Sequence, residues 1–384
     1  PASTRLDKDF LAPFLQRLST DGYIGIGKTI DAFARFAAYS NDERVISRKK
    51  HLVDTLIGSQ ENDGYVGTMR KDARTSHLWD IHELSYIVLG LTSDYRFCGE
   101  KGSLQAAEKL ADYLIAQLIA RPRPKVGPDD LSAVMGTTGL DEAMLDLAEQ
   151  SGNSKYRQFV IEDRSLAAWR MPIVVGRWGK IEGHAYAYLC ESMSQARLIP
   201  FVSDDGLWEQ TRKAFDFMLD GDGLAITGAC GDHECWNNTQ SGTTNLGETC
   251  TTAYQVRFYD WLLRQTGEPL YGDLMERAIH NALFGAQSQD GRRIRYYTPF
   301  EAPRKYHEGD TYCCPCNYRR ILPAIPSMIY YAAGSGVFVN LYTESSALVP
   351  LTDGTVVAIE QKTDYPNSGH VVFRLSPSRN ATFT

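Results

Sequence analysis

Three observations predict a mainly α-helical fold with a short β-rich end. Apolar residues recur at helical spacing in paired segments, one pair every 40 to 50 residues or so, up to about residue 335. From Gly336 onward the pattern changes to short β-branched runs. The 384 residues, 43% hydrophobic and 23% charged, are composed like an ordinary globular protein. The repeated helical hairpins favour a solenoid or a closed α/α toroid, followed by the start of an antiparallel sheet.

Turn-forming residues separate the predicted helices. Asp42-Glu43-Arg44 is typical of a capped helix start, and Ser151-Gly152-Asn153 and Gly267-Glu268-Pro269 divide helices into pairs. Arg121-Pro122-Arg123-Pro124 predicts the end of another helix, because proline lacks the backbone donor. The helices predicted are Ile30–Tyr39, Val45–Leu56, His82–Leu91, Leu104–Ile119, Leu140–Gln150, Tyr156–Trp169, His184–Ala196, Leu207–Leu219, Thr251–Thr266, Tyr271–Phe284 and Asn317–Tyr331.

Strands are predicted for the three β-rich runs Val337–Leu341, Thr355–Ile359 and Val371–Leu375. Turns such as Thr352-Asp353-Gly354 separate them. The last residues, 381–384, are typical of a strand that continues, so we expect the sequence to belong to a longer protein. We therefore predict two domains, residues 1–335 and residues 336–384.

Composition argues against several classes of partner. The net charge of -7 is spread along the chain without a long basic run, which disfavours nucleic acid and anionic membranes. An apolar run long enough to span a membrane is missing from the sequence. Eight cysteines are too few for a disulfide scaffold, and their clustering favours a reducing compartment and metal ligation. The sequence begins at Pro1, so the choice between cytoplasm and periplasm stays open.

A cysteine cluster is the sharpest chemical signal. Cys313, Cys314 and Cys316 fall within four residues, and Glu248-Thr249-Cys250 adds a thiol and a carboxylate upstream. Glu248, Cys250, Cys313 and Cys314 together offer one carboxylate and three sulfurs, a donor set that suits zinc and also iron. We expect Glu248 and Cys250 to ligate from a loop or a helix start. The adjacent Cys313 and Cys314 are expected to need an irregular backbone.

Two long polar stretches, Glu61–Arg70 and Gly221–Gly247, are the predicted walls of a cleft. The second contains Glu234, a carboxylate free to act beside a metal centre. Twenty-one tyrosines and six tryptophans are compatible with a sugar-binding cleft, although core packing explains any one of them equally well.

Several motifs together resemble the bacterial glycoside hydrolase family 127, typified by β-L-arabinofuranosidases. The two most specific are Glu248-Thr249-Cys250, similar to the family's E-T-C, and Cys313-Cys314-Pro315-Cys316-Asn317, similar to its C-C-P-x-N. The weaker ones, in chain order, are Gln60-Glu61-Asn62-Asp63-Gly64-Tyr65, Asp80-Ile81-His82-Glu83-Leu84, Glu182-Gly183-His184-Ala185 and the Thr227–Glu234 loop. The resemblance covers nearly the whole chain.

The resemblance implies an (α/α)6 barrel followed by β-sandwich domains, and a zinc-dependent retaining exo-glycosidase. It implies that Glu248, Cys250, Cys313 and Cys314 bind Zn²⁺. Cys313 would be the nucleophile and Glu234 the acid/base. The residues implied to line the sugar pocket are His82, His184, Asp63, Tyr65 and His233.

Each assignment has a structural alternative. Cys313 is otherwise a purely structural ligand, and Glu234 a loop carboxylate capping a turn. His82 and His184 are otherwise helix caps or satisfied core residues, and Asp63 and Tyr65 members of a plain turn. His233 is otherwise a solvated loop histidine.

The segment Asp232–Trp236 departs from the family pattern, since a glycine is expected directly before the glutamate, and Cys316 replaces a proline or glycine. A related hydrolase acting on another sugar, such as a 3,6-anhydrogalactoside, is therefore the second hypothesis. A non-catalytic carbohydrate-binding toroid with structural zinc is the third. A homodimer is one assembly considered for the full protein.

Overall fold

A computed structural model describes residues 5–18, 23–76, 78–120, 136–178, 181–241, 243–334 and 336–380. The chain groups into two compact units, which we describe separately. The helical unit comprises Pro1–Phe258 and Arg277–Ile321, and the strand unit comprises Tyr259–Glu276 and Leu322–Thr384. The domain boundary near residue 335 stays a prediction, because compact units describe packing whereas domains describe independent folding.

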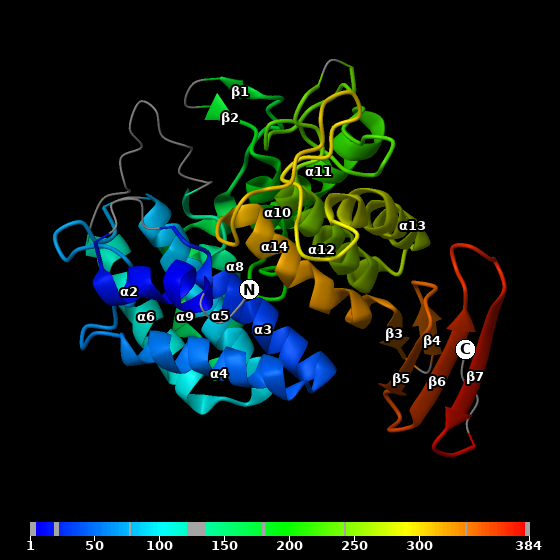
Figure 1. Cartoon of the computed structure of the whole chain (residues 1–384), viewed down its shortest axis with the longest axis horizontal. Coiled ribbons are helices and arrows are strands. Elements are labelled where there is room, and N and C mark those ends of the chain that lie inside the picture. Colours follow the sequence, from blue (N-terminus) through cyan, green and yellow to red (C-terminus); the bar gives the residue numbers. More distant parts are fainter. Residues whose placement is uncertain are drawn as a thin grey trace. The chain divides into compact units, whose positions relative to one another are not determined.

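The helical unit is built from hairpins of an inner and an outer helix (Figure 1). Neighbouring inner helices contact one another in the order α14, α3, α5, α8 and α10, and α12 joins this set through side chains described below. The inner helices are α3 (Ile26–Ser40), α5 (Leu78–Cys98), α8 (Leu140–Ser151), α10 (Ala185–Ala196), α12 (Thr249–Thr266) and α14 (Cys313–Ile321). Their outer partners within this unit are α4 (Glu43–Gly58), α6 (Lys101–Ala120), α9 (Lys155–Glu162) and α11 (Glu209–Asp220). Helix α12 continues past Phe258 into the strand unit, which also contains α13 (Pro269–Arg277) up to Glu276. This arrangement confirms the predicted helical toroid.

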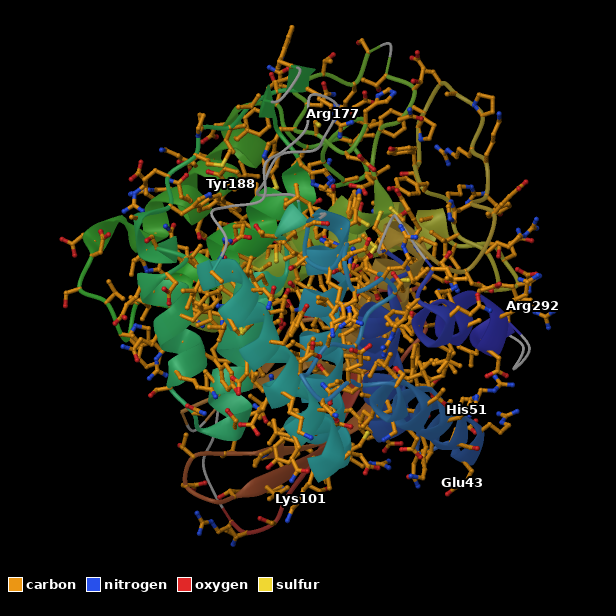
Figure 2. All side chains as sticks on the ribbon, turned by 90° about the vertical axis from the view of Figure 1, so that its left-hand side faces the viewer. Glu43, His51, Lys101, Arg177, Tyr188 and Arg292 are labelled. Atoms are coloured by element: carbon orange, nitrogen blue, oxygen red, sulfur yellow. The ribbon has the colours of Figure 1, made fainter. Side chains whose placement is uncertain are left out.

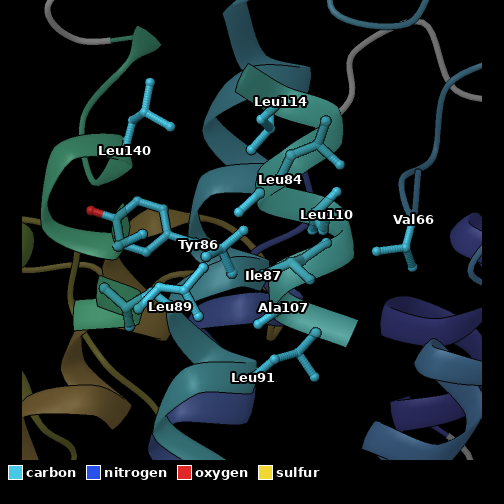
Figure 3. Packing of buried hydrophobic residues seen from close by; sticks show 14 of the residues in the cluster. Val66, Leu84, Tyr86, Ile87, Leu89, Leu91, Ala107, Leu110, Leu114 and Leu140 are labelled. Atoms are coloured by element: carbon cyan, nitrogen blue, oxygen red, sulfur yellow. The ribbon is translucent and has the colours of Figure 1, made fainter. Parts of the chain in front are cut away.

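Helix α5 is the centre of the hydrophobic core. Every residue from Asp80 to Asp94 is buried, which is typical of a helix surrounded on all sides. Its residues Leu84, Ile87 and Leu91 pack beside Ala107, Leu110 and Leu114 of α6 (Figure 3). Each such side chain contributes roughly 1.5–3 kcal/mol through its removal from water. This packing holds the short segments that carry the site.

A polar network joins the inner helices. The Tyr86 hydroxyl of α5 lies 2.7 Å from that of Tyr254 on α12 and 3.0 Å from that of Tyr186 on α10. Arg320 of α14 donates to the Tyr254 hydroxyl at 3.0 Å and to Asp31 of α3 at 2.7 Å. Because these buried groups are hydrogen-bonded to one another, the network sets the register of five inner helices.

The predicted helices before residue 300 are found, and their ends differ by several residues in places. Helix α4 begins after Asp42, whose side chain accepts from the Arg44 backbone N–H, as the capped start predicted. Helix α9 ends at Glu162 rather than Trp169, and α13 passes at Arg277 into a π-helical turn, Ala278–Leu283. The sequence did not predict η1 (Leu6–Leu11), α2 (Ala12–Gln16) or the hairpin of β1 (Arg177–Trp178) and β2 (Ile181–Glu182).

The prediction of one helix over Asn317–Tyr331 is wrong. Helix α14 begins earlier, at Cys313, and ends at Ile321. A 3₁₀ segment, Leu322–Met328, follows, and Tyr330 already belongs to strand β3 (Tyr330–Ala333). Pro323 and Pro326 explain the early end, since neither can donate a helical hydrogen bond.

The strand unit contains two antiparallel sheets. Strand β3 pairs with β4 (Gly336–Val339), and a second sheet has the order β5 (Ser345–Pro350), β6 (Val356–Thr363), β7 (Val371–Pro377). Val349, Val357 and Ile359 form its small apolar core. The predicted start of an antiparallel sheet is confirmed, although β3 and β5 were missed. Residues 121–124 and 381–384, for which a helix end and a strand were expected, lie outside the described residues.

Within the described residues, none of the helices combines the length and apolar character that a membrane crossing requires.

Candidate active site

Two helix N-termini bring the four predicted metal ligands together. Glu248 directly precedes α12, and Cys250 lies in its first turn. Cys313 and Cys314 are the first two residues of α14. One ligand atom of each residue lies within 4.8 Å of the others, and all four residues are buried. The positive ends of two helix dipoles point toward the thiols, which favours their anionic form.

The expectation of an irregular backbone at Cys313 and Cys314 is wrong, because both have helical conformation. The irregular residue is Tyr312, whose φ of 87° turns the chain sharply before the helix. Adjacent helical residues point about 100° apart, and this separation still lets both sulfurs reach one shared centre.

Outer hydrogen bonds orient the ligand atoms. The Thr251 hydroxyl donates to Glu248 Oε2 at 2.7 Å, and the Cys314 thiol donates to Glu248 Oε1 at 3.4 Å. The Asn317 amide donates to Cys250 Sγ at 3.1 Å. Metal ligands in proteins are usually held by such outer partners, which fix their direction and raise their basicity.

The donor set fits a metal ion. In a tetrahedral zinc–thiolate site with bonds of about 2.3 Å, the sulfurs stand about 3.8 Å apart, which the upper limit of 4.8 Å between ligand atoms in this group allows. Without a cation, burial and then the Glu234 carboxylate raise the pKa of Glu248 well above its ordinary value. A buried group of one carboxylate and three thiols is therefore a plausible cation site, because a cation would relieve both penalties.

Tyr296 joins the cluster to the predicted acid/base. Its hydroxyl lies 2.7 Å from Glu234 Oε1 and 2.9 Å from Cys313 Sγ. The backbone carbonyl of Tyr296 accepts from the Thr249 N–H at 2.9 Å, which fastens its loop to the start of α12. Sequence reasoning missed this residue. The only signal was an adjacent pair of tyrosines, Tyr296-Tyr297, inside a polar loop.

Glu234 stands at the tip of a strained turn. Asp232 and Cys235 exchange two backbone hydrogen bonds of 2.9 and 3.0 Å, and the two residues between them, His233 and Glu234, have φ values of 49° and 72°. This left-handed pair is typical of a type I′ turn, in which glycine is favoured. The structure thus explains why a glycine before Glu234 would be expected, and it keeps the carboxylate pointing away from its own strand.

Hydrogen bonds to both imidazole nitrogens hold the turn. His233 Nδ1 lies 2.6 Å from Asp232 Oδ2, and Nε2 lies 2.6 Å from the Asn245 side-chain nitrogen. Arg177 of β1, labelled in Figure 2, donates to Glu234 Oε2 at 3.2 Å. Glu234 therefore has a cation on one oxygen and a phenol on the other. Sequence reasoning also missed Arg177, which belongs to no motif.

The electrostatics of the cluster single out Cys313. Burial opposes its ionisation, but hydrogen bonds from the Cys250 and Cys314 thiols, the Lys28 cation and the Tyr296 hydroxyl outweigh burial, so the pKa of Cys313 lies well below that of an ordinary thiol. Burial raises the pKa of Cys250 and Cys314 instead. Among these three thiols, the one that contacts Tyr296 is therefore the most readily ionised.

The two predicted histidines occupy different settings. His82 is buried in α5, packed edge-on against the rings of Tyr23 and Trp79, with Nε2 3.4 Å from Lys28 Nζ. His184 caps α10, because its Nδ1 accepts from the Ala187 N–H at 3.3 Å. Their roles in sugar binding stay predictions.

Asp63 and Tyr65 belong to a separate hydrogen-bonded loop. Asp63 accepts from the Tyr65 N–H at 3.1 Å, and the Tyr65 hydroxyl donates to Asp80 at 3.1 Å. The Arg74 guanidinium lies 4.0 Å from the centre of the Tyr65 ring and is ion-paired with Glu61. The structure does not bring this pair into hydrogen-bonding contact with the described cysteine cluster, and their substrate role stays a prediction.

Glu83 is a further residue whose role the sequence did not suggest. Its carboxylate accepts from the backbone N–H groups of Ile24, Gly25 and Ile26 at 2.6–2.8 Å, which caps the start of α3. The Asp80–Leu84 motif therefore anchors the α3 N-terminus, next to α14.

Comparisons with known proteins point to one family. The family model described as "Beta-L-arabinofuranosidase, GH127 catalytic domain" matches residues 15–327. A non-reducing end β-L-arabinofuranosidase of Bifidobacterium longum is 23% identical across 99% of this chain and 65% of its own length. The chain thus spans about two thirds of the length of this curated relative.

Solved structures show the same fold. A GH127 β-L-arabinofuranosidase from Geobacillus stearothermophilus superposes with a TM-score of 0.76 at 21% identity, covering 96% of this chain and 66% of that one. A cellobiose 2-epimerase from Bacillus thermoamylovorans superposes with a TM-score of 0.55 at 12% identity, covering 84% and 97%. The epimerase shares the helical toroid without the family match, so fold alone does not decide function. The match over residues 15–327 does decide the family: this chain belongs to the GH127 β-L-arabinofuranosidase family of glycoside hydrolases.

Proposed function

We propose that the protein is a retaining exo-glycosidase that hydrolyses a terminal furanoside, β-L-arabinofuranoside first among the candidates. Family membership supports the hydrolase class and the sugar. The arrangement of Glu234, Tyr296 and Cys313 supports the mechanism, because it pairs a carboxylate with an ionised sulfur at the distance that such a mechanism uses.

That distance is the observation on which the proposal depends. Glu234 Oε1 and Cys313 Sγ are 2.7 and 2.9 Å from the same Tyr296 oxygen, so they are separated by at most the sum, about 5.6 Å. Retaining glycosidases keep their two reactive groups about 5–5.5 Å apart, whereas inverting enzymes need about 6.5–9.5 Å to admit a water molecule. The bound of about 5.6 Å favours direct attack by the protein and retention of anomeric configuration.

The steps follow from these positions. Cys313 Sγ attacks the anomeric carbon while Glu234, protonated, gives its proton to the departing glycosidic oxygen. The anomeric carbon is then bonded to sulfur, and Glu234 is a carboxylate. Glu234 next takes a proton from water as that water attacks the anomeric carbon, and the bond to Cys313 breaks. Tyr296 contacts both groups and would keep their separation fixed through both steps.

We assign Glu248, Cys250, Cys313 and Cys314 as ligands of Zn²⁺, which the softness and spacing of the donors support. A bound zinc ion would hold the three sulfurs deprotonated at neutral pH. Thr251 and Asn317 orient two of the ligands, and Arg177 orients Glu234.

The test is hydrolysis of a panel of aryl glycosides, with metal analysis of the same preparation. We expect release from the β-L-arabinofuranoside, about one zinc per chain, and a first-formed product of retained configuration by NMR. Inversion would overturn the mechanism. Zinc with release only from another compact sugar, such as a 3,6-anhydrogalactoside, would move the substrate to that sugar, and zinc without any release would favour a carbohydrate-binding role.

A further inference from the structure

A lysine ammonium is buried near the start of α3 without an ion-pair partner. Lys28 has 0% solvent exposure. Its Nζ lies 3.2 Å from the Tyr23 hydroxyl, 3.3 Å from the Tyr186 hydroxyl and 3.4 Å from His82 Nε2. None of the carboxylates in the described residues pairs with it, whereas the buried Lys49 is paired with Asp94 at 2.7 Å.

These neighbours do not neutralise the charge. The ammonium lies 4.1 Å from the centre of the Tyr86 ring, and this cation–π contact and the two hydroxyls replace part of its hydration. An isolated buried cation is nevertheless expensive, and proteins compensate it with an opposite charge. The buried Glu83 carboxylate lies within electrostatic range of Lys28, but its oxygens accept from the backbone N–H groups that start α3 and do not pair with the ammonium. A further anion is therefore expected nearby.

The helix that carries Lys28 contacts the helix that carries the thiols. The Tyr312 N–H donates to the Ile24 carbonyl at 3.1 Å, and the Tyr312 ring packs on Tyr23 at 5.4 Å. A methyl group placed on Gly25 would lie 2.7 Å from Cys316 Sγ. The first turns of α3 and α14 are thus in direct contact, which places the anionic cluster beside the ammonium.

The two tyrosines whose hydroxyls contact the ammonium also interact electrostatically with the cluster. Burial and then Cys313 raise the pKa of Tyr23, and burial, followed by other tyrosines and by Cys250, raises that of Tyr186. Lys28 also lies within electrostatic range of Cys313. Lys28 and the donor set therefore interact across this short layer of tyrosines.

The charge of the proposed centre needs such a partner. Three thiolates and one carboxylate carry four negative charges, and a divalent ion neutralises two of them. We propose that Lys28 is the buried counter-charge of this metal centre and determines its affinity for Zn²⁺. The inference rests on the metal set of the proposed function. Lys28 acts through the ligands and not on the sugar, since no part of its side chain is exposed.

The experiment compares Zn²⁺ affinity of the whole protein, by competition with a chromophoric chelator, in Lys28→Met and the wild type. An apolar side chain of similar length removes the charge and its desolvation penalty together, so the metal-free variant should keep the wild-type circular dichroism and unfolding temperature. We expect the Zn²⁺ dissociation constant to rise about 10- to 100-fold, the scale of outer-shell changes at metal sites.

Two further variants separate charge from other effects. Lys28→Gln, which keeps a hydrogen-bond donor but no charge, should lose the same affinity, and it also serves if Lys28→Met does not fold. Lys49→Met removes a buried positive charge from another part of the helical unit and should leave Zn²⁺ affinity unchanged.

Each contrary result has a distinct meaning. If a folded Lys28→Met protein binds Zn²⁺ with wild-type affinity, Lys28 is not the counter-charge, and the assignment of the metal site is unaffected. Wild-type affinity in Lys28→Gln alone assigns the effect to hydrogen bonding and also overturns it. A wild-type protein that binds no Zn²⁺ overturns the metal centre and this inference together.

Discussion

The two loops predicted to line the cleft differ in where their polar groups point. In the first, Glu61 and Asp63 both pair with Arg74, four residues beyond the loop, and Glu61 also pairs with Arg17. In the second, Glu234 turns away from its own loop toward Tyr296 and Arg177, residues from distant parts of the chain. Both acids of the first loop are occupied by arginine side chains, whereas Glu234 of the second loop shares the Tyr296 hydroxyl with the Cys313 sulfur.

The difference teaches that two loops can look alike in sequence and still differ in how their charged groups are paired and how their backbone is strained. Both are polar and rich in turn residues. The first contains no non-glycine residue in left-handed conformation, whereas the described part of the second contains three, Asp222, His233 and Glu234. Backbone strain of this kind costs of order 1–3 kcal/mol per residue and persists where surrounding structure holds it. We therefore expect substitutions in the second loop and its partners to change activity, and those in the first to change stability.

The largest effect is expected from Cys313→Ala. Removal of the proposed nucleophile should lower kcat/KM on an aryl β-L-arabinofuranoside by roughly 10³-fold or more. Cys98→Ala, a half-buried thiol on the last residue of α5, is the matched control and should retain activity. Zinc content is measured in both variants, and a Cys313→Ala protein that turns over normally would show that the sulfur is only structural.

Glu234→Gln should have the next largest effect, about 10²- to 10⁴-fold on kcat, because proton transfer to the leaving oxygen is lost. The loss should shrink for aryl groups that leave readily as anions, since these need no proton. Rates are measured across leaving groups of increasing acidity. Equal losses for every leaving group would contradict the role of general acid.

Tyr296→Phe should lower kcat by about 10- to 100-fold. Hydrogen bonds to charged groups contribute about 1.5–3 kcal/mol, and this hydroxyl serves both reactive residues. Tyr297→Phe removes the neighbouring hydroxyl and serves as the control. An unchanged kcat in Tyr296→Phe would show that neither Glu234 nor Cys313 needs this hydroxyl, and it would weaken the argument from their distance.

Arg74→Met should have the smallest effect on activity, with kcat within about twofold of the wild type. It removes a partner of Glu61 and the cation over Tyr65, at a cost of roughly 1–3 kcal/mol in the free energy of unfolding. Chemical denaturation and steady-state rates are measured together. A loss of rate comparable to that of Glu234→Gln would place the first loop in the active site after all.

Much of the fold followed from local patterns. The apolar periodicity of α3, α4 and α6 and the capping residue Asp42 identified helices whose ends depend on nearby residues. The prediction of the α14 helix was wrong at both ends. Its start depends on Tyr312, which turns the chain, and its end depends on two prolines inside an otherwise apolar run. The short β1–β2 hairpin was not predicted, because strands of two residues are too short to show an alternation of apolar and polar residues.

The sequence by itself determined the chemistry of the donor set. The cysteine pair and the Glu-x-Cys segment supply thiol and carboxylate donors whatever fold the chain adopts. Only the tertiary structure decided the placing of Tyr296, Arg177 and Lys28 around it. Each comes from a different element, and no local pattern marks a residue whose partners lie far along the chain. Residue type sets what a side chain is able to do, and long-range packing sets which partner it meets.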